Sequence, residues 1–263
     1  MTLAAWRQSL GARVRAAARS VGSAAGARNV VLPSPNIWHW PDIYETENRA
    51  QDVDGEIWRV LRECCDWSGL DVVDVGCGDG FHLPRFAERA RDVVGVEPHP
   101  PLLHRAARRV AAVPNAAVVA GSAQRMALPD ASRDVVHART AFFFGPGCEP
   151  GMIEADRVLR PGGALVIVDL DARHSPYGDW MRADLPQYDP EGVDRFFAEA
   201  GFDCRRVITT WRFADRASLE AVLRIEFSAS VSRRAIEETP GLSLPVGYRV
   251  HIRRKPSGIV LTL

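Results

Sequence analysis

Three glycines at alternate positions follow a short apolar run and are the first candidates for ligand chemistry. The segment reads VVDVGCGDG, from Val72 to Gly80, with glycines at positions 76, 78 and 80. Because glycine has no Cβ, it lets the backbone adopt positive φ and approach a ligand closely. Open α/β sheets bind their ligands at such turns, where a parallel strand ends. The segment therefore predicts a strand, a ligand-binding turn and a helix that starts near Phe81.

Acidic residues around this turn limit the class of ligand that the turn can bind. Asp74 precedes the first glycine by two positions, Asp79 lies inside the turn, and Glu97 ends the next apolar run, DVVGVE. The two aspartates would repel a pyrophosphate, which nicotinamide enzymes bind with a related GxGxxG turn, and they suit a cationic ligand. A surface-facing glutamate at the tip of a second strand can accept hydrogen bonds from ribose hydroxyls.

Together these residues resemble the class I S-adenosylmethionine-dependent methyltransferases, in particular the small-molecule, methyltransferase type 11-like group with the pattern DVGCGxG. Two later segments match in chain order. AGSAQRMALPDASRDVVHAR is similar to the family's region between the third and fourth strands, and EADRVLRPGGALVIVDLD to its helix, Pro-Gly-Gly turn and fifth strand. The resemblance covers about residues 44–171, and more loosely the end of the chain.

The resemblance implies a Rossmann-like, doubly wound α/β fold with seven strands, the last one antiparallel, and S-adenosylmethionine as cofactor. It places one group of residues at the methionine part, a second at the ribose and a third at the adenine. In that order, these are Asp74, Gly76, Cys77 and Gly78; Glu97 and Pro98; Ser122, Ala123 and Gln124. The family usually has an acidic residue where this chain has Ser122. The Ser122 hydroxyl or the Gln124 side chain would therefore accept the hydrogen bond from the adenine amino group here.

Two polar residues follow the fourth predicted strand, where the family's methyl group meets its acceptor. His137 could act as a general base, and a core histidine with satisfied hydrogen bonds is the equal alternative. Arg139 could hold an acidic acceptor through a bidentate pair, or could form an ordinary surface ion pair. Methyl transfer from a sulfonium mainly needs alignment and a water-poor site, so a base is optional.

The segment before the predicted domain is rich in proline and tryptophan. LPSPNIWHWP, residues 32–41, predicts an ordered loop, and its tryptophans need a surface to cover. We expect a lid over the cofactor with Tyr44 near the cofactor carboxylate, and core packing is the alternative. From Leu3 onwards the pattern predicts a basic amphipathic helix. Residues 1–41 are thus interpreted as a basic arm and lid loop, and residues 42–263 as the methyltransferase domain.

The remaining pattern alternates strands with helices. Continuous β-branched runs predict strands that start at positions 71, 92, 116, 134 and 163, which is typical of a parallel sheet buried on both faces. Single helices are expected over residues 48–67, 191–200 and 217–238. The segments FDCRRVITTWRF and VGYRVHIRRK are expected as the two last strands.

Composition excludes several classes of function. The 33 basic and 33 acidic residues balance, so the chain lacks the basic field of a nucleic-acid partner, and no NPPY-type motif follows the fourth strand. Five cysteines without zinc spacing predict no metal site and suit a reducing compartment, and no apolar run predicts a membrane span. We therefore expect a cytoplasmic enzyme with a small-molecule substrate.

Three alternatives remain open beside this interpretation. They are a nucleic-acid methyltransferase, a nicotinamide-dependent oxidoreductase and a non-catalytic cofactor-binding module. The sequence leaves the oligomeric state open, with a homodimer as one option.

Overall fold

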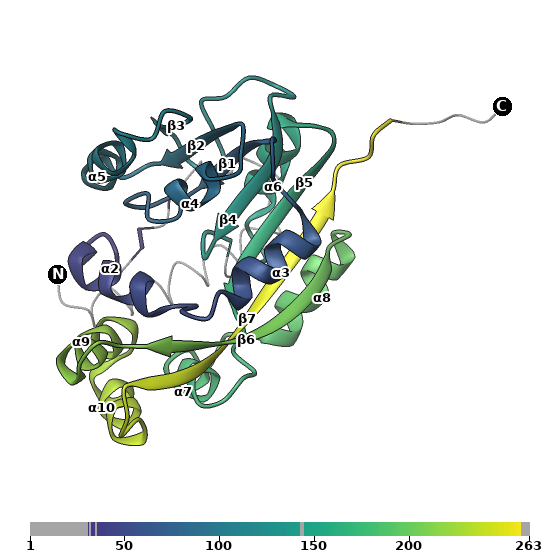
Figure 1. The fold of residues 1–263 in the computed structure, drawn as a ribbon. Coiled ribbons are helices and arrows are strands. Elements are labelled where there is room, and N and C mark those ends of the chain that lie inside the picture. Colours follow the sequence, from purple (N-terminus) through teal and green to yellow (C-terminus); the bar gives the residue numbers. More distant parts are fainter. Residues whose placement is uncertain (1–30, 32, 35, 143–144, 259–263) are drawn as a thin grey trace.

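A seven-stranded mixed sheet organises the part of the chain that the structure describes (Figure 1). The structure is a computed structural model, and it describes residue 31 and residues 33–34, 36–142 and 145–258. The strand order is β3-β2-β1-β4-β5-β7-β6. The strands are β1 (Asp71–Val75), β2 (Asp92–Glu97), β3 (Ala116–Ala120), β4 (Arg133–Arg139), β5 (Leu159–Leu170), β6 (Asp203–Arg212) and β7 (Ser243–Arg254).

The directions of the strands confirm the predicted fold class. Strands β1 to β5 pair in parallel with one another, whereas β7 runs antiparallel to both β5 and β6. The carboxyl ends of β1, β2 and β4 therefore meet at one edge of the sheet, next to the glycine-rich turn. All five residues of β1 are buried, and the three valines among them pack on both faces of the sheet.

Helices cover both faces of the sheet, and the sheet separates two hydrophobic cores. They are α2 (Pro41–Ala50), α3 (Glu56–Cys64), α4 (Leu83–Ala87), α5 (Pro100–Val110), α6 (Glu149–Val158), α7 (Tyr177–Asp184), α8 (Pro190–Glu199), α9 (Arg216–Glu226) and α10 (Ala229–Glu238). Successive residues of a strand point to opposite faces. Val72 accordingly packs in the core of α3, α4 and α5, whereas Val73 packs in the core of α6 and α8.

Two helices that the sequence predicts as single are each broken in two. The expected helix over residues 48–67 is interrupted after Ala50, where Asp52 and Gly55 adopt positive φ of 50° and 75°. The Asp52 carboxylate accepts a hydrogen bond from the Ile57 amide (3.0 Å) and so stabilises the start of α3. The expected helix over residues 217–238 ends at Glu226, and Ser228 caps the next one.

Three further differences concern where two helices begin or end and the presence of one additional helix. Helix α3 ends at Cys64 rather than at Trp67, α4 begins at Leu83 rather than near Phe81, and α7 was not expected. The amphipathic helix expected from Leu3 lies outside the described residues. Among the described helices, none combines the length and the apolar character that a membrane span requires.

Helix α2, which precedes the first strand, packs against a helix from the last part of the chain. This helix, α9, in turn packs against α10, and Figure 1 shows α2 between the parallel strands and α9, with α10 farther away beside α7. Residues from α2, α7, α9 and β7 are thereby brought close to the carboxyl edge of the parallel strands. This arrangement places side chains near the turn that lie far from it in the sequence.

Candidate functional site

The glycine-rich turn has the backbone conformation that its sequence predicts. Gly76, Gly78 and Gly80 adopt φ of 69°, 60° and 80°, and the Gly76 and Cys77 amides donate to the Val96 carbonyl (2.8 and 3.1 Å). The turn is thus fixed to the end of β2. The Cys77 side chain is buried, and this burial raises the pKa of its thiol well above the usual value. Cys77 therefore presents its backbone to the turn, while its thiol lies inside the protein.

Glu97 is tied to the same turn. Its carboxylate accepts hydrogen bonds from the amides of Gly78 and His99, each at 2.9 Å. The side chain is 3% exposed, so the expected surface-facing position is wrong, because the turn folds over the end of β2. Burial raises the pKa of Glu97 to about 7, although the two amide hydrogen bonds oppose this rise. A carboxylate has about four acceptor positions, so two remain for a ribose diol.

Asp74 holds His137 inside the sheet. The two residues are register partners on β1 and β4, and Nδ1 of His137 lies 2.7 Å from an Asp74 carboxylate oxygen. Both side chains are buried, and the imidazole packs against Phe86 with ring centroids 4.8 Å apart. Within the described part of the chain, Nε2 of His137 has no hydrogen-bond partner. Asp74 thus orients the imidazole, and the role of His137 as a base stays a prediction.

Asp79 does not contribute the free negative charge that the sequence suggested. Its carboxylate lies 2.8 Å from the Arg109 guanidinium, which also contacts Glu45 at 3.0 Å. Arg109 comes from α5, so the sequence around the turn gave no sign of it. Asp79 therefore joins the turn to α5 and α2, and its charge is neutralised within the protein.

The loop before α2 covers the glycine-rich turn. A Cβ on Gly78 would stand 2.7 Å from Cδ1 of Ile37, so any larger residue at this position would force the isoleucine side chain to shift. The Trp38 indole stacks on the His99 imidazole with centroids 4.2 Å apart and planes 10° apart. The side-chain amide of Asn36 donates to Glu226 of α9. The lid position proposed for this loop stays a prediction, and these contacts place the loop beside Glu97.

The residues predicted at the adenine follow β3. Ser122, Ala123 and Gln124 are half-buried, and Ser122 and Arg125 exchange backbone hydrogen bonds of 3.1 and 3.0 Å. Ala123 lies beside Gly151 of α6. Pro98 is half-buried directly after Glu97. These residues therefore lie beyond the carboxyl ends of β2 and β3, and their roles toward a cofactor stay predictions.

Arg139 is half-buried and takes part in a polar network, and among the described residues its guanidinium forms no ion pair. It donates to the Gln51 side chain (2.7 Å), and its guanidinium lies over the Tyr248 ring, 5.4 Å from the centroid. Gln51 in turn donates to Glu47 at 2.7 Å. The network thus runs from the end of β4 into α2.

Most members of this network, which we call the α2–α9 cluster, could not be predicted from the sequence. The cluster contains Tyr44, Glu47, Gln51, Arg139, Tyr177, Glu226 and Tyr248. Its members come from α2, β4, α7, α9 and β7. One signal was available, since Tyr44 and Glu47 share a face of α2 at helical spacing and Gln51 follows directly after the helix. The other members belong to no motif and meet only in the folded chain.

Burial shifts the pKa values of several groups in and beside the α2–α9 cluster. Burial first, and then the neighbouring Glu226 carboxyl, raise the pKa of Glu47 well above its usual value. Burial also raises the pKa of Tyr44, with Glu47 and Glu226 adding to it and a hydrogen bond to Thr140 opposing it. Beside the cluster, burial lowers the pKa of His82, and the positive charge of Arg139 adds to this effect.

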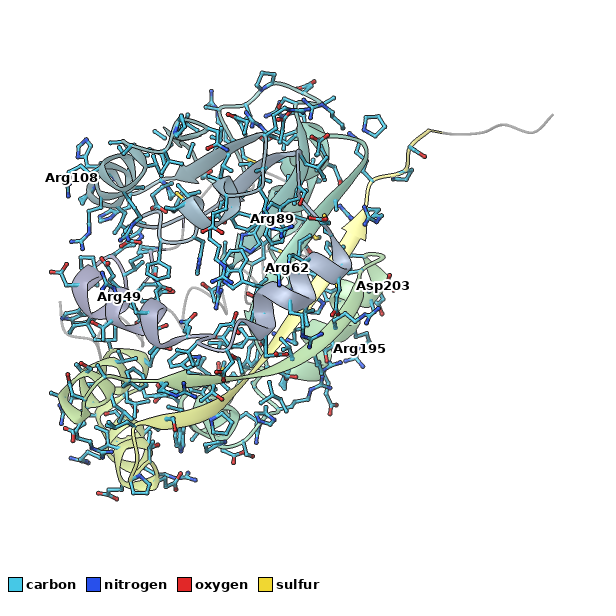
Figure 2. The ribbon with its side chains drawn as sticks, viewed as in Figure 1. Arg49, Arg62, Arg89, Arg108, Arg195 and Asp203 are labelled. Atoms are coloured by element: carbon cyan, nitrogen blue, oxygen red, sulfur yellow. The ribbon has the colours of Figure 1, made fainter. Side chains whose placement is uncertain are left out.

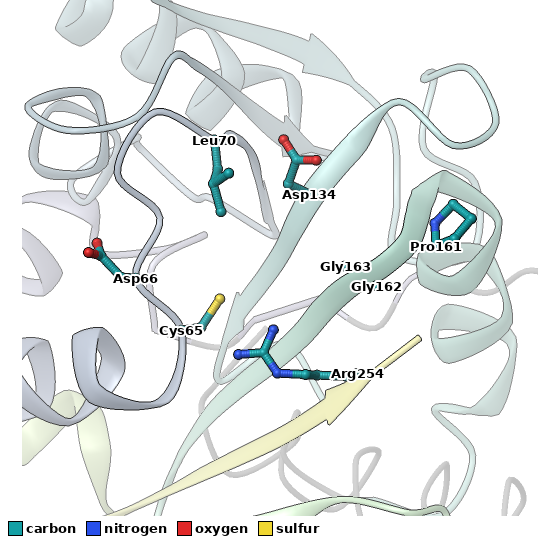
Figure 3. A pocket seen from close by; sticks show the side chains of 8 residues that line it. All are labelled: Cys65, Asp66, Leu70, Asp134, Pro161, Gly162, Gly163 and Arg254. Atoms are coloured by element: carbon teal, nitrogen blue, oxygen red, sulfur yellow. The ribbon is translucent and has the colours of Figure 1, made fainter. Parts of the chain in front are cut away.

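A small hollow lies at the opposite edge of the sheet (Figure 3). It is lined by Cys65, Asp66, Leu70, Asp134, Pro161, Gly162, Gly163 and Arg254. These residues lie near the amino ends of β1, β4 and β5. Because doubly wound sheets bind ligands at the carboxyl ends of their strands, this hollow is not the expected cofactor site.

Comparisons with known proteins fit this geometry. The family model described as a methyltransferase domain matches residues 73–167. An uncharacterized methyltransferase of Mycobacterium tuberculosis is 36% identical over 110 residues, which are 40% of this chain and 44% of that protein. A probable S-adenosylmethionine-dependent methyltransferase of Mycolicibacterium smegmatis is 26% identical over 189 residues, 69% of this chain and 70% of that protein.

Solved structures show the same fold. The YcgJ protein of Bacillus subtilis aligns with a TM-score of 0.56 at 15% identity, covering 77% of this chain and 98% of that one. At this identity the likeness concerns the fold alone. The chain spans less than half of the mycobacterial relative of 36% identity.

Proposed function

We propose that this chain, which belongs to the class I S-adenosylmethionine-dependent methyltransferase family, transfers the methyl group of S-adenosylmethionine to a small-molecule acceptor. When bound, the cofactor supplies the methyl carbon, to which an acceptor lone pair bonds while the carbon–sulfur bond breaks and its electron pair stays on sulfur. The observation that carries the proposal is the joint placement of Glu97 and the glycine-rich turn at the carboxyl ends of β1 and β2.

Each part of this edge has a role in the proposal. The Glu97 carboxylate would accept hydrogen bonds from the ribose diol, and the backbone of Gly76, Cys77 and Gly78 would face the methionine part. The residues after β3 would contact the adenine. The loop that carries Ile37 and Trp38 would exclude water, which an in-line displacement favours. The chain's own contribution is then mainly alignment and a dry site.

The balance of 33 basic and 33 acidic residues supports a small acceptor over a nucleic acid. Figure 2 labels five exposed arginines, which lie on or directly after five different helices. These are Arg49, Arg62, Arg89, Arg108 and Arg195. A nucleic-acid enzyme needs clustered cations to neutralise phosphates. The loop over the turn also suits an acceptor that can be enclosed.

Two measurements test the proposal. Calorimetric titration should show binding of S-adenosylhomocysteine and no binding of NAD⁺, and the reverse preference would favour an oxidoreductase. Incubation with S-adenosylmethionine and a panel of small acceptors should then release S-adenosylhomocysteine above the rate without acceptor. Cofactor binding without any such release, across amines, alcohols and acids, would favour a non-catalytic cofactor-binding module.

A further inference from the structure

The loop before α2 is held from two sides. On one side Ile37 packs on Gly78 of the glycine-rich turn, with its Cδ1 in the space that a Cβ on Gly78 would need. On the other side the side-chain amide of Asn36 donates a hydrogen bond to Glu226, the last residue of α9. Residues 36–40 therefore bridge the turn and a helix from the last part of the chain.

Asn36 also shapes the loop itself. Its backbone carbonyl accepts hydrogen bonds from the amides of His39 (3.2 Å) and Trp40 (2.8 Å), and Trp40 is the N-cap of α2. The Asn36 side chain is half-buried. A change at this side chain should therefore reach the turn that leads into α2, and the amides of His39 and Trp40 report on that turn.

The Glu226 carboxylate is oriented by a second donor. Its Oε1 accepts from Asn36, whereas its Oε2 accepts from the hydroxyl of Tyr177, a buried residue of α7. The Glu47 carboxyl of α2 lies beside it. A carboxylate at the C-terminal end of a helix is disfavoured by the helix dipole, and donors from other elements offset this effect. Tyr177 thus holds Glu226 where it meets the loop, and a hydrogen bond to a charged acceptor is stronger than a neutral one.

The two kinds of contact respond differently when the loop moves. Apolar packing is not directional, whereas a hydrogen bond is lost once donor and acceptor are more than about 3.5 Å apart. A cofactor that faces the backbone of Gly78 enters and leaves past Ile37. Opening of the loop therefore has to break the hydrogen bond between Asn36 and Glu226.

We propose that Asn36 and Glu226 are positioning residues that hold this loop closed over the glycine-rich turn and thereby slow the release of the cofactor and of its demethylated product. The part that concerns release rests on the proposed function, since it takes the turn as the cofactor site. The closure of the loop by this pair needs no ligand. The pair would then limit turnover, because lid opening precedes product release.

Reversing donor and acceptor tests the pair. Asn36→Asp removes the donor and places a second carboxylate against Glu226. The double variant Asn36→Asp/Glu226→Gln restores one hydrogen bond, with the donor now on α9. Hydrogen exchange is recorded in the full chain without ligand near pH 8. The His39 and Trp40 amides should exchange about tenfold faster in the single variant, and within about threefold of the wild type in the double variant.

A matched control separates this effect from general destabilisation. Asn115, directly before β3, is another half-buried asparagine, and its side-chain amide donates to the carbonyls of Ala87 (2.9 Å) and Ala90 (3.0 Å). Asn115→Asp should lower the Tm and leave hydrogen exchange at His39 and Trp40 unchanged. The proposal is overturned if these two amides exchange in Asn36→Asp as in the wild type, or as fast in the double variant as in Asn36→Asp.

Release of S-adenosylhomocysteine tests the functional part. In stopped-flow measurements, release should be about tenfold faster from Asn36→Asp than from the wild type, and slow again in the double variant. Equal release rates from all three proteins would overturn the control of release by this pair. If the wild type does not bind S-adenosylhomocysteine in calorimetry while the hydrogen-exchange pattern holds, the proposed function fails and the closure of the loop by Asn36 and Glu226 stands.

Discussion

Glu97 is a single carboxyl group that combines three features: burial, two amide donors and a pKa of about 7. Its ionised form is the one that accepts hydrogen bonds from a ribose diol. Binding of the ribose should therefore release a proton whenever Glu97 is protonated beforehand. This couples cofactor affinity to pH in the neutral range.

The affinity for S-adenosylhomocysteine should consequently rise with pH and level off above the pKa of Glu97. Because that pKa is raised to about 7, the ionised fraction grows about tenfold between pH 6 and pH 8, and so should the affinity. Calorimetry across this range measures the effect. A flat profile, or an affinity that falls as pH rises, would show that Glu97 does not hold the ribose as a carboxylate.

The contacts of His137 lead to a second prediction at this scale. His137→Ala would leave the buried Asp74 carboxylate without its partner and should lower the free energy of unfolding by about 1–3 kcal/mol. His137→Asn provides a matched variant, because its amide can still donate to Asp74. If His137 is a base, the asparagine variant should retain affinity for S-adenosylhomocysteine and lose turnover. Full turnover in a stable His137→Asn variant would exclude the base role.

At the scale of elements, the parallel strands could be predicted because burial on both faces leaves a continuous apolar run, as in residues 164–168 of β5. The breaks in the two long helices were missed because local capping decides them. Ser228 is the N-cap of α10 without a glycine or proline nearby, and Asp52, inside an apparently helical pattern, accepts a hydrogen bond from the Ile57 amide of α3. Helical periodicity carries across such short interruptions, so it does not reveal them.

The same distinction applies to the site. The glycine-rich turn and Glu97 are encoded within residues 71–97, so their joint position follows from one strand–turn–helix–strand unit. The α2–α9 cluster depends on packing between α2 and α9, and the pairing of Glu47 with Glu226 has no local signature. Arg109 reaches Asp79 in the same way, from α5. Long-range contacts of this kind follow only from the complete fold.

The loop before α2 gives a prediction at this scale. Because Ile37 packs on Gly78 and Trp38 stacks on His99, cofactor binding should increase the protection of residues 36–40 and Tyr44 in hydrogen exchange. The amides of α8, on the other face of the sheet, serve as the internal control. Trp38→Ala should speed the release of S-adenosylhomocysteine in stopped-flow measurements. Equal protection with and without the cofactor would contradict the role of the loop as a lid.

At the scale of the whole molecule, the cofactor edge joins segments that lie far apart in the sequence, from residue 37 to residue 141. The turn contacts β2 through Val96, the Ile37 loop through Gly78 and the end of β4 through Ala141. A ligand held there should stabilise the folded chain as a unit. At a hundredfold excess over its Kd, S-adenosylhomocysteine should raise the free energy of unfolding by about 2.7 kcal/mol. Urea unfolding measures this change, and NAD⁺ at equal concentration should have no effect.

The central claim, that this edge of the sheet holds S-adenosylmethionine through Glu97, is tested most directly by titrating S-adenosylhomocysteine into the wild type and Glu97→Gln near pH 8. Because a hydrogen bond to a charged group is worth about 1.5–3 kcal/mol, the variant should bind about ten- to a hundredfold more weakly. Glu88→Gln, at the exposed end of α4, is the matched control and should bind like the wild type. A loss below about threefold in a folded Glu97→Gln protein would contradict the account.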